Sequence, residues 1–339
     1  MLQAIMVEPG KIEYKDIPIP EVQDHEVKIK IKSIGVCGSD IHVNHGKHPY
    51  TSYPVVQGHE VSAEVIEIGS EVDHLKVGDK VTVQPQDVCG ECYPCRNNNY
   101  NACEKLKVFG FQTTGMASEY FVVDAKKVLP LPKDMTWDQG ALIEPLAVAV
   151  HAVKRVNDVK GKKVLVLGGG PIGNLVAQSA KALGAEKVLI SELSNYRLKV
   201  AKECGVETID ANKESVEDAV DKHFGPDKAD YIFECVGINP TMDQAINVAR
   251  KGSTIVVVGV FADLGNINMG FIQDHELTLK GSAMYQEEDY LASIQLVENN
   301  LINLDSLITN HVHFKSFKDA YDLIDEQQDK VMKVMIEME

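Results

Sequence analysis

The sequence is short of positive charge. It has 34 lysines and arginines against 50 aspartates and glutamates, so its formal net charge is −16. A protein that binds nucleic acid needs a basic surface to contact phosphates, and anionic membranes attract basic segments in the same way. The composition therefore argues against nucleic acid and membrane surfaces as the main partners.

The sequence also lacks a long apolar run and an export signal. Its best apolar stretch, residues 141–153, is too short to cross a bilayer and contains Glu144 and Pro145. The first nine residues do not combine a basic region with a long apolar region, as a signal peptide does. There is no internal repeat and no low-complexity segment. These absences predict a cytoplasmic protein with reduced cysteines, and 339 residues suggest two domains.

Four of the seven cysteines stand close together, in a C-x2-C-x2-C-x7-C pattern made by Cys89, Cys92, Cys95 and Cys103. Zinc binds four thiolates tetrahedrally, and ligands this close can surround one ion from a tight loop. Because four thiolates fill every coordination position, such a zinc is structural. Disulfides and an iron–sulfur cluster are the alternatives, but disulfides need an oxidising compartment.

The first part of the chain has a β-strand pattern. Residues 27–32 alternate strictly between apolar side chains and lysines, which is typical of a half-buried strand. Further short strands are expected at 61–65, 81–83 and 118–123, with glycine and proline between them. This pattern indicates a small β-barrel-like domain.

The pattern changes near Pro145, where strands begin to alternate with helices. Helices are expected at 172–183, 195–204 and 241–250. The expected strands are 164–167, 187–191, 207–210, 231–235, 254–259 and 277–281. This alternation predicts an α/β fold with a doubly wound parallel sheet. After Gln286 the chain is again helical and ends in an apolar strand, 331–338, that does not fit the parallel sheet.

A glycine-rich loop follows the first strand of the α/β region. Residues 168–173 fit the pattern G-x-G-x-x-G between an apolar strand and a helix. Gly168 permits a tight turn, Gly170 lets the backbone approach a pyrophosphate, and Gly173 permits close packing of helix on strand. The context favours dinucleotide binding over an ordinary turn between a strand and a helix.

An acidic residue ends the next expected strand. Glu192 stands 24 residues after Gly168 and can accept hydrogen bonds from the ribose hydroxyls of a dinucleotide. Its charge would repel a 2′-phosphate, so NAD is favoured over NADP. Arg197 lies nearby in the sequence and keeps NADP open as an alternative.

Three separate segments carry residues that suit a catalytic zinc. Cys37 follows the first clear strand, His59 lies in a Gly-His-Glu segment, and Glu144 begins an apolar helix. Three such ligands leave one coordination position open, where an alcohol can bind and have its pKa lowered. Each residue also has an ordinary explanation: a buried apolar cysteine, a hydrogen-bonded loop histidine, and a carboxylate in the first turn of a helix.

Together these motifs resemble the zinc-dependent medium-chain dehydrogenase/reductase family over essentially the whole chain. They occur in the family's order: GVCGSDIH at 35–42, GHE at 58–60, the cysteine cluster, IEP at 143–145 and GGGPIG at 168–173. The pairing of GHE with IEP is similar to the polyol branch, which includes sorbitol, galactitol-phosphate, threonine and sugar-acid dehydrogenases. Simple alcohol dehydrogenases have a cysteine where Glu144 falls. The segments IKIKSIGVCGSDIH and SYPVVQGHE most resemble L-galactonate and L-idonate 5-dehydrogenases.

The resemblance implies two domains. Residues 1–147 would form a GroES-like catalytic domain, with the tail 287–339 returning to it, and residues 148–286 would form a Rossmann NAD-binding domain. The active site would lie in the cleft at the carboxyl ends of the parallel strands. A homodimer or homotetramer is expected through the edge strand near 277–283.

The resemblance also implies a function. It is reversible hydride transfer between NAD and a secondary alcohol of a polyol or sugar acid, with one catalytic and one structural zinc per chain. Threonine or butanediol dehydrogenase-like activity is the alternative substrate class. A non-catalytic NAD-binding regulatory protein is the alternative of another class, which the complete set of zinc ligands and relay residues disfavours. A zinc-free quinone reductase is disfavoured by the two metal sites.

Site residues are matched to the family position by position. Cys37 and His59 match ligands of the catalytic zinc, and the third ligand is either Glu60 or Glu144. Ser39 and His42 match a proton relay from the alcohol to solvent. The structural zinc would be held by Cys89, Cys92, Cys95 and Cys103. The expected cofactor-binding positions are Gly168, Gly170, Pro171, Ile172, Gly173, Glu192, Arg197, Gly237, Val258, Gly259 and Val260.

The substrate pocket is less defined by the sequence. Its candidate walls are the aromatic residues Tyr50, Phe109, Phe111 and Tyr285. The loop His45-Gly46-Lys47-His48 is locally basic in an acidic protein. We hypothesise that this loop attracts a carboxylate or phosphate of the substrate, and a solvated surface loop is the alternative.

Overall fold

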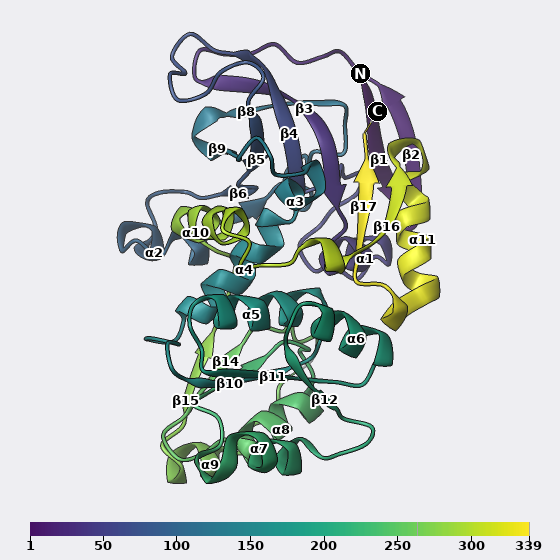
Figure 1. The fold of residues 1–339 in the computed structure, drawn as a ribbon. Coiled ribbons are helices and arrows are strands. Elements are labelled where there is room, and N and C mark those ends of the chain that lie inside the picture. Colours follow the sequence, from purple (N-terminus) through teal and green to yellow (C-terminus); the bar gives the residue numbers. More distant parts are fainter. Residues whose placement is uncertain (263, 339) are drawn as a thin grey trace. The chain divides into compact units, whose positions relative to one another are not determined.

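A computed structural model describes residues 1–262 and 264–338, and its chain forms two compact units (Figure 1). The first unit is Met1–Glu144 with Ile308–Glu339, and the second is Pro145–Leu307. The expected tail began earlier, at residue 287. The difference arises because α10 (Glu287–Glu298) belongs to the second unit, where its Asp289 pairs with His151 and Lys154 of α4 (Ile143–Lys154).

The first unit is built on a seven-stranded sheet in the order β16-β17-β3-β4-β5-β9, with β8 also paired to β3. These strands are β3 (Glu26–Gly35), β4 (Glu60–Ile68), β5 (Lys80–Val83), β8 (Tyr120–Asp124), β9 (Val128–Pro130), β16 (Ile308–His313) and β17 (Lys333–Glu337). Two-stranded pairs are formed by β1 (Leu2–Glu8) with β2 (Lys11–Asp16) and by β6 (Gln86–Asp87) with β7 (Lys107–Val108). The helices are α1 (Gly38–Asn44), α2 (Tyr93–Arg96), α3 (Trp137–Ala141) and α11 (Phe317–Gln327).

Strand β3 is central in this sheet because of its alternating sequence. Its Val27, Ile29 and Ile31 are fully buried. The lysines between them point to the other face, where Lys28 and Lys32 pair with carboxylates of β4. This is the half-buried strand that the period-two pattern predicted.

The last strand of the chain pairs with β3. The register of β17 on β3 is antiparallel, with Met335 opposite Gly35 and Ile336 opposite Ile34. This pairing is the reason that the apolar C-terminal segment did not fit the parallel sheet. It also brings residues 331–337 beside the loop that follows β3, where the candidate site lies.

The second unit contains a six-stranded parallel sheet in the order β12-β11-β10-β13-β14-β15. Its strands are β10 (Lys163–Leu167), β11 (Lys187–Glu192), β12 (Glu207–Asp210), β13 (Tyr231–Glu234), β14 (Thr254–Val257) and β15 (Thr278–Gly281). Besides α4 and α10, its helices are α5 (Pro171–Ala182), α6 (Asn195–Glu203), α7 (Val216–Phe224), α8 (Asn239–Val248) and α9 (Met269–Asp274). Figure 1 shows α5 and α6 on one face of this sheet and α7, α8 and α9 on the other. The predicted doubly wound α/β fold is confirmed.

The strand order reverses direction beside β10, the first strand of the sheet. In open parallel sheets, ligands bind at the carboxyl ends of the strands at such a switch point. The glycine-rich loop follows β10 and therefore lies at this position. No helix in the described parts of the chain is both long and apolar enough to cross a membrane.

Candidate functional site

Three potential metal ligands converge in the first unit at the ends of β3 and β4. Cys37 is the residue before α1, His59 is the residue before β4, and Glu60 is the first residue of β4. One ligand atom from each of the three lies within 4.8 Å of the others. Gly35 is opposite Glu60 in the sheet, and a Cβ at position 35 would stand 2.2 Å from Glu60 Oε2. The absence of a side chain at Gly35 is therefore what makes room for this carboxylate.

The electrostatics of this cluster favour a bound cation. His59 is buried, and burial by itself opposes its charged form. The charges of Asp40, Cys37 and Glu144 outweigh this effect and raise the pKa of His59 to about 10. A soft thiolate, an imidazole and a carboxylate with further carboxylates nearby are a suitable donor set for zinc.

The carboxylate of Glu60 is held by a buried lysine from the last strand. Lys333 Nζ lies 2.5 Å from both Glu60 oxygens and donates a further hydrogen bond to the carbonyl of Val36 at 2.9 Å. Burial alone would lower the pKa of Lys333, but Glu60, Cys37 and Glu144 raise it. Lys333 is therefore a protonated buried cation that balances the charge of Glu60.

Glu144 lies in the first turn of α4 and is buried. Its charge acts on both His59 and Lys333, so it belongs to the same anionic environment. However, the close set of ligand atoms among the described residues contains Glu60 and not Glu144. The geometry therefore favours Glu60 as the third ligand.

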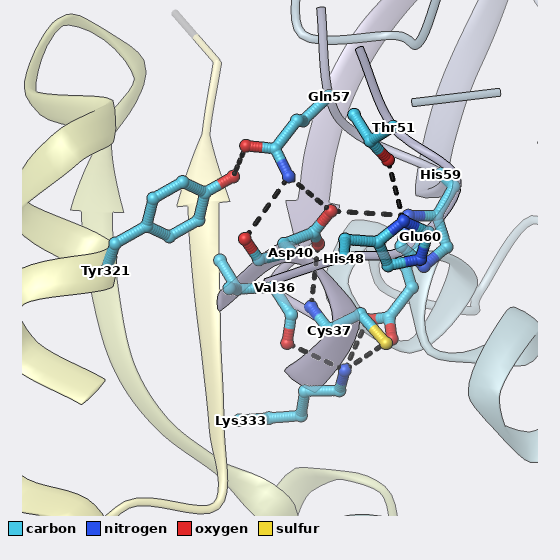
Figure 2. A network of polar contacts seen from close by, with 10 residues as sticks. All are labelled: Val36, Cys37, Asp40, His48, Thr51, Gln57, His59, Glu60, Tyr321 and Lys333. Carbon is cyan, nitrogen blue, oxygen red and sulfur yellow. Dashed lines mark hydrogen bonds and ion pairs between the residues drawn. The ribbon is translucent and has the colours of Figure 1, made fainter. Parts of the chain in front are cut away.

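A chain of buried polar groups leads away from His59 (Figure 2). His59 Nδ1 lies 3.6 Å from Asp40 Oδ1, and Asp40 Oδ2 accepts a hydrogen bond from the backbone N–H of Cys37 at 2.9 Å. Gln57 donates to Asp40 Oδ1 at 3.0 Å, and the hydroxyl of Tyr321 on α11 donates to Gln57 Oε1 at 3.0 Å. The sequence prediction did not include Asp40, Gln57, Tyr321 or Lys333.

Both residues matched to the proton relay lie on α1. Ser39 and His42 are three residues apart in this helix and so share a face. Ser39 is half-buried and His42 is exposed. This arrangement is suitable for passing a proton from a buried site toward solvent.

The aromatic residue beside the metal ligands is Phe111. Its ring centroid lies 4.9 Å from that of His59 and 4.6 Å from that of His48, on which it stacks. Of the other candidate walls, Tyr50 contacts His48 edge to face, with 6.1 Å between the ring centroids. Tyr50 is 73% exposed, Phe109 packs on Phe121 and under Lys127, and Tyr285 of the second unit is fully buried against Tyr290.

The predicted four-cysteine cluster is assembled as one compact loop around α2. The thiol sulfurs of Cys92 and Cys95 are 3.3 Å apart, those of Cys92 and Cys103 3.8 Å, and those of Cys103 and Cys89 3.5 Å. These separations are far too long for disulfides but close to the edge of a tetrahedron of sulfurs each about 2.3 Å from zinc. Backbone N–H groups of Cys95 and Glu104 lower the pKa of Cys92 to about 6. The cluster therefore fits a structural zinc site.

In the second unit, the glycine-rich loop has the geometry of a dinucleotide cradle. Gly168 has a φ of +96°, and Gly170 is the N-cap of α5. A Cβ at Gly173 would stand 1.9 Å from the carbonyl oxygen of Gly168, so only glycine fits this crossing of helix and strand. Pro171 and Ile172 form the first turn of α5, whose N-terminus can bind an anion.

Glu192 lies at the end of β11 and faces this loop. Its Oε2 accepts a hydrogen bond from the backbone N–H of Gly169 at 2.8 Å, and its Oε1 accepts from Leu193 and Ser194. Arg197 Nη1 lies 3.9 Å from Glu192 Oε2. The carboxylate therefore lies beside the glycine-rich loop.

The residues expected near the nicotinamide are organised by a buried carboxylate that the sequence prediction missed. Glu234, at the end of β13, is fully buried, and its Oε1 accepts the N–H groups of Val236 and Gly237 at 2.9 Å each. The N–H groups of Val258 and Gly259 donate to its backbone carbonyl. Val260 follows and is 84% exposed. An acidic residue closing a buried strand is the signal that could have indicated Glu234.

Comparison with known proteins agrees with this arrangement. Residues 23–133 match the family model described as "Alcohol dehydrogenase GroES-like domain", and residues 171–299 match "Zinc-binding dehydrogenase". L-galactonate-5-dehydrogenase of Escherichia coli K12 is 34% identical over 94% of this chain and 93% of its own length. Sorbitol dehydrogenase of Halalkalibacterium halodurans is 34% identical over 96% of both chains.

Solved structures of similar fold include galactitol-1-phosphate dehydrogenase from Escherichia coli. It superposes with a TM-score of 0.92, at 30% identity and over 99% of both chains. Both family models and similarity along nearly the whole chain point the same way. The chain belongs to the zinc-dependent medium-chain dehydrogenase/reductase family, in the polyol and sugar-acid branch that its motifs predicted.

Proposed function

We propose that this protein reversibly oxidises a secondary alcohol of a polyol or sugar acid, with NAD as the hydride acceptor. The observation that carries the proposal is the convergence of Cys37, His59 and Glu60 beside buried carboxylates. The same chain carries a dinucleotide cradle in its second unit. A set of metal ligands and a dinucleotide cradle together are what zinc-dependent hydride transfer requires.

In this proposal Cys37, His59 and Glu60 hold the catalytic zinc, and the four-cysteine loop holds the structural one. When bound, the catalytic zinc supplies a Lewis acid that lowers the pKa of an alcohol. Ser39 accepts the proton that the alcohol releases, and His42 passes it to solvent. Phe111 packs against the ring of His59 and limits the access of water to that side of the ligand.

The cofactor residues of the second unit are assigned in the same way. The loop 168–173 would bind the pyrophosphate, and Glu192 would bind the ribose hydroxyls. Gly237 and residues 258–260 would flank the nicotinamide. When bound, NAD supplies the hydride acceptor. The position of Glu192 beside the loop supports NAD over NADP, because a 2′-phosphate would meet its negative charge.

The substrate class is best tested by activity. The similar curated proteins include an L-galactonate 5-dehydrogenase and a sorbitol dehydrogenase, so we propose an acidic or neutral polyol. NAD and NADP reduction should be measured with L-galactonate, L-idonate, sorbitol, threonine and butanediol, together with zinc content per chain. We expect two zinc ions per chain and turnover of a sugar acid or polyol with NAD. Fewer than two zinc ions, with no turnover of any compound, would favour a non-catalytic NAD-binding protein.

The basic loop supports a preference for a sugar acid. In the first unit His45 is paired with Asp325 at 2.8 Å, and His48 stacks on Phe111, so Lys47 is the exposed cation of this loop. We expect Lys47→Ala to lower kcat/KM for L-galactonate about tenfold and to leave sorbitol within about twofold, since one charge-assisted contact is worth roughly 1.5 kcal/mol. Equal losses on both substrates would show that Lys47 does not bind the substrate carboxylate.

We also propose a homo-oligomer formed through the second unit. Strand β15 is at the edge of the six-stranded sheet, and an edge strand can pair with a second copy. Light scattering on the purified protein would give a dimer or tetramer mass, whereas a monomer mass would contradict this proposal.

A further inference from the structure

Tyr321 of α11 is connected to the proposed catalytic metal site through two buried side chains, those of Gln57 and Asp40. Figure 2 shows Tyr321, Gln57 and Asp40 in sequence toward His59. The four side chains are 1–4% exposed. Burial of so many polar groups is costly unless each has its hydrogen-bond partner, so their arrangement is well defined.

The direction of each hydrogen bond follows from its chemistry. Gln57 Nε2 lies 3.3 Å from the backbone carbonyl of Asp40 and 3.0 Å from its Oδ1. A carbonyl oxygen only accepts, so the amide nitrogen of Gln57 must face Asp40 and its oxygen must face Tyr321. The Tyr321 hydroxyl consequently donates to Gln57, and no other orientation satisfies the set.

This chain of donors fixes Asp40 from one side. The backbone N–H of Cys37 fixes its other oxygen at 2.9 Å. The carboxylate thereby faces His59 Nδ1 at 3.6 Å, a ring nitrogen that forms no hydrogen bond with any described residue. Nε2 is the other nitrogen of the ring and is left for the metal.

We infer that Tyr321 and Gln57 are positioning residues of the proposed catalytic zinc site, which hold Asp40 so that it orients His59 for binding through Nε2. The inference rests on the proposed function only in assigning zinc to this site. Groups behind a metal-ligating histidine fix its ring orientation, and their loss typically weakens metal binding 10- to 100-fold. Tyr321 acts two side chains away from His59, so we expect an effect near the lower limit.

The test is the rate at which purified, zinc-loaded protein loses zinc to a chromogenic chelator. Tyr321→Phe and Gln57→Met each remove the hydrogen bond while nearly preserving side-chain volume. Tyr14→Phe is the matched control, because the Tyr14 hydroxyl bonds the Phe314 carbonyl and the Phe317 N–H at the entry to α11, and not the Tyr321–Gln57–Asp40 chain. In the Cys37→Ser protein only the four-cysteine loop holds zinc, so its release curve gives the rate for that loop alone.

The zinc of the Cys37 site is the part of the release curve that is missing in Cys37→Ser. We expect this zinc to be released about tenfold faster in Tyr321→Phe and Gln57→Met than in the wild type. We expect Tyr14→Phe to release zinc at the wild-type rate. Equal rates in Tyr321→Phe and Tyr14→Phe would overturn the inference, even if the Tyr321→Phe protein melts at a lower temperature. Should Tyr321→Phe not fold, a wild-type release rate in Gln57→Met would overturn it.

The zinc-release assay is independent of the substrate. If a polyol is oxidised but the release rates are unchanged, this inference fails and the proposed function remains. If the rates change but no alcohol is oxidised, the proposed function fails and the positioning role remains.

Discussion

The four-cysteine loop and the Cys37–His59–Glu60 cluster belong to the same unit but have different neighbours. The loop takes its ligands from 15 consecutive residues, and the charged pair beside it, Lys105 with Glu91, is about two-thirds exposed on both sides. The Cys37 cluster takes its ligands from the segment after β3 and from the start of β4, and it is surrounded by buried charges, among them Lys333 and Asp40. The cysteine loop can supply all four ligands of a metal ion. The Cys37 cluster supplies three ligands and surrounds them with buried charges.

The number of ligands in each cluster determines whether a bound metal can also bind a substrate. Four like ligands satisfy one metal and leave no position for a substrate. Three unlike ligands with buried charged partners can hold a metal and still leave one position open. The cost is that every buried charge needs a partner, and this requirement extends the site to the C-terminal strand and helix. Substitutions that change one cluster at a time can test this difference.

The largest effect is expected from loss of a ligand in each cluster. Cys37→Ser should lower turnover at least about 10³-fold, since a zinc Lewis acid contributes several kcal/mol to the barrier. It should also remove one zinc per chain with little change in thermal midpoint. Cys92→Ser should remove the other zinc, expose residues 89–103 to proteolysis and leave measurable turnover. Activity and zinc analysis on both proteins give the answer. Complete loss of turnover in Cys92→Ser would contradict the division of roles.

A smaller effect is expected from removing the lysine beside each cluster. Lys333→Met leaves Glu60 as an unpaired buried charge, which typically costs about 3–5 kcal/mol of unfolding free energy. Lys105→Met removes an exposed pair and should cost less than about 1 kcal/mol. Denaturant unfolding with and without chelator measures both. The Lys333→Met loss should be greater after zinc removal, because zinc is the remaining cation near Glu60.

Similar losses in Lys333→Met and Lys105→Met would show that the buried charges at the Cys37 cluster are not mutually dependent. The same result would remove the main difference between the two clusters. A Lys333→Arg variant keeps the charge and separates its loss from a change in packing.

The smallest effect concerns a buried carboxylate that has protein partners and no adjacent metal ligands. Burial would raise the pKa of Asp289, but bonds from His151, Lys154 and the N–H of Gln286 lower it. Its unfolded-state pKa is about 3.9, so its stabilisation is complete above about pH 4 and is lost as pH falls through the lower folded-state pKa. Asp289→Asn should therefore cost about 2 kcal/mol at neutral pH and progressively less in acid.

Denaturant unfolding at pH 7 and pH 3 measures this dependence, and chelator should not change it. A loss that grew with zinc removal would mean that the buried charges of the two units are coupled through the metal. Wild-type stability in Asp289→Asn at pH 7 would contradict the assigned ion pairs.

The elements that could be predicted from the sequence are those whose residue pattern is local. The six parallel strands were located because each is a short apolar run between helices, and Cys37 and His59 stand beside recognisable glycine motifs. The cysteine loop was located because its ligands are contiguous. In these cases the physical cause lies within a few residues of the sequence.

The missing parts of the site depend on pairing between distant segments. Lys333 reaches Glu60 only because β17 pairs with β3 in one register, and a shift of one residue would turn its side chain to the other face. Tyr321 meets Gln57 across 264 residues of sequence. Phe111 rather than Phe109 contacts His59 because the chain turns between them. No local pattern encodes these contacts.

The pairing of β17 with β3 also has a consequence for biosynthesis. The second unit is one continuous segment, Pro145–Leu307, whereas the first unit needs residues on both sides of it. On the ribosome, residues 1–144 emerge first but lack Lys333 and Tyr321 until the second unit has been made. Domains fold as their sequence becomes available. The segment synthesised first is thus completed last, and the nascent chain acquires its proposed catalytic zinc ligand geometry only after the dinucleotide cradle can already have formed.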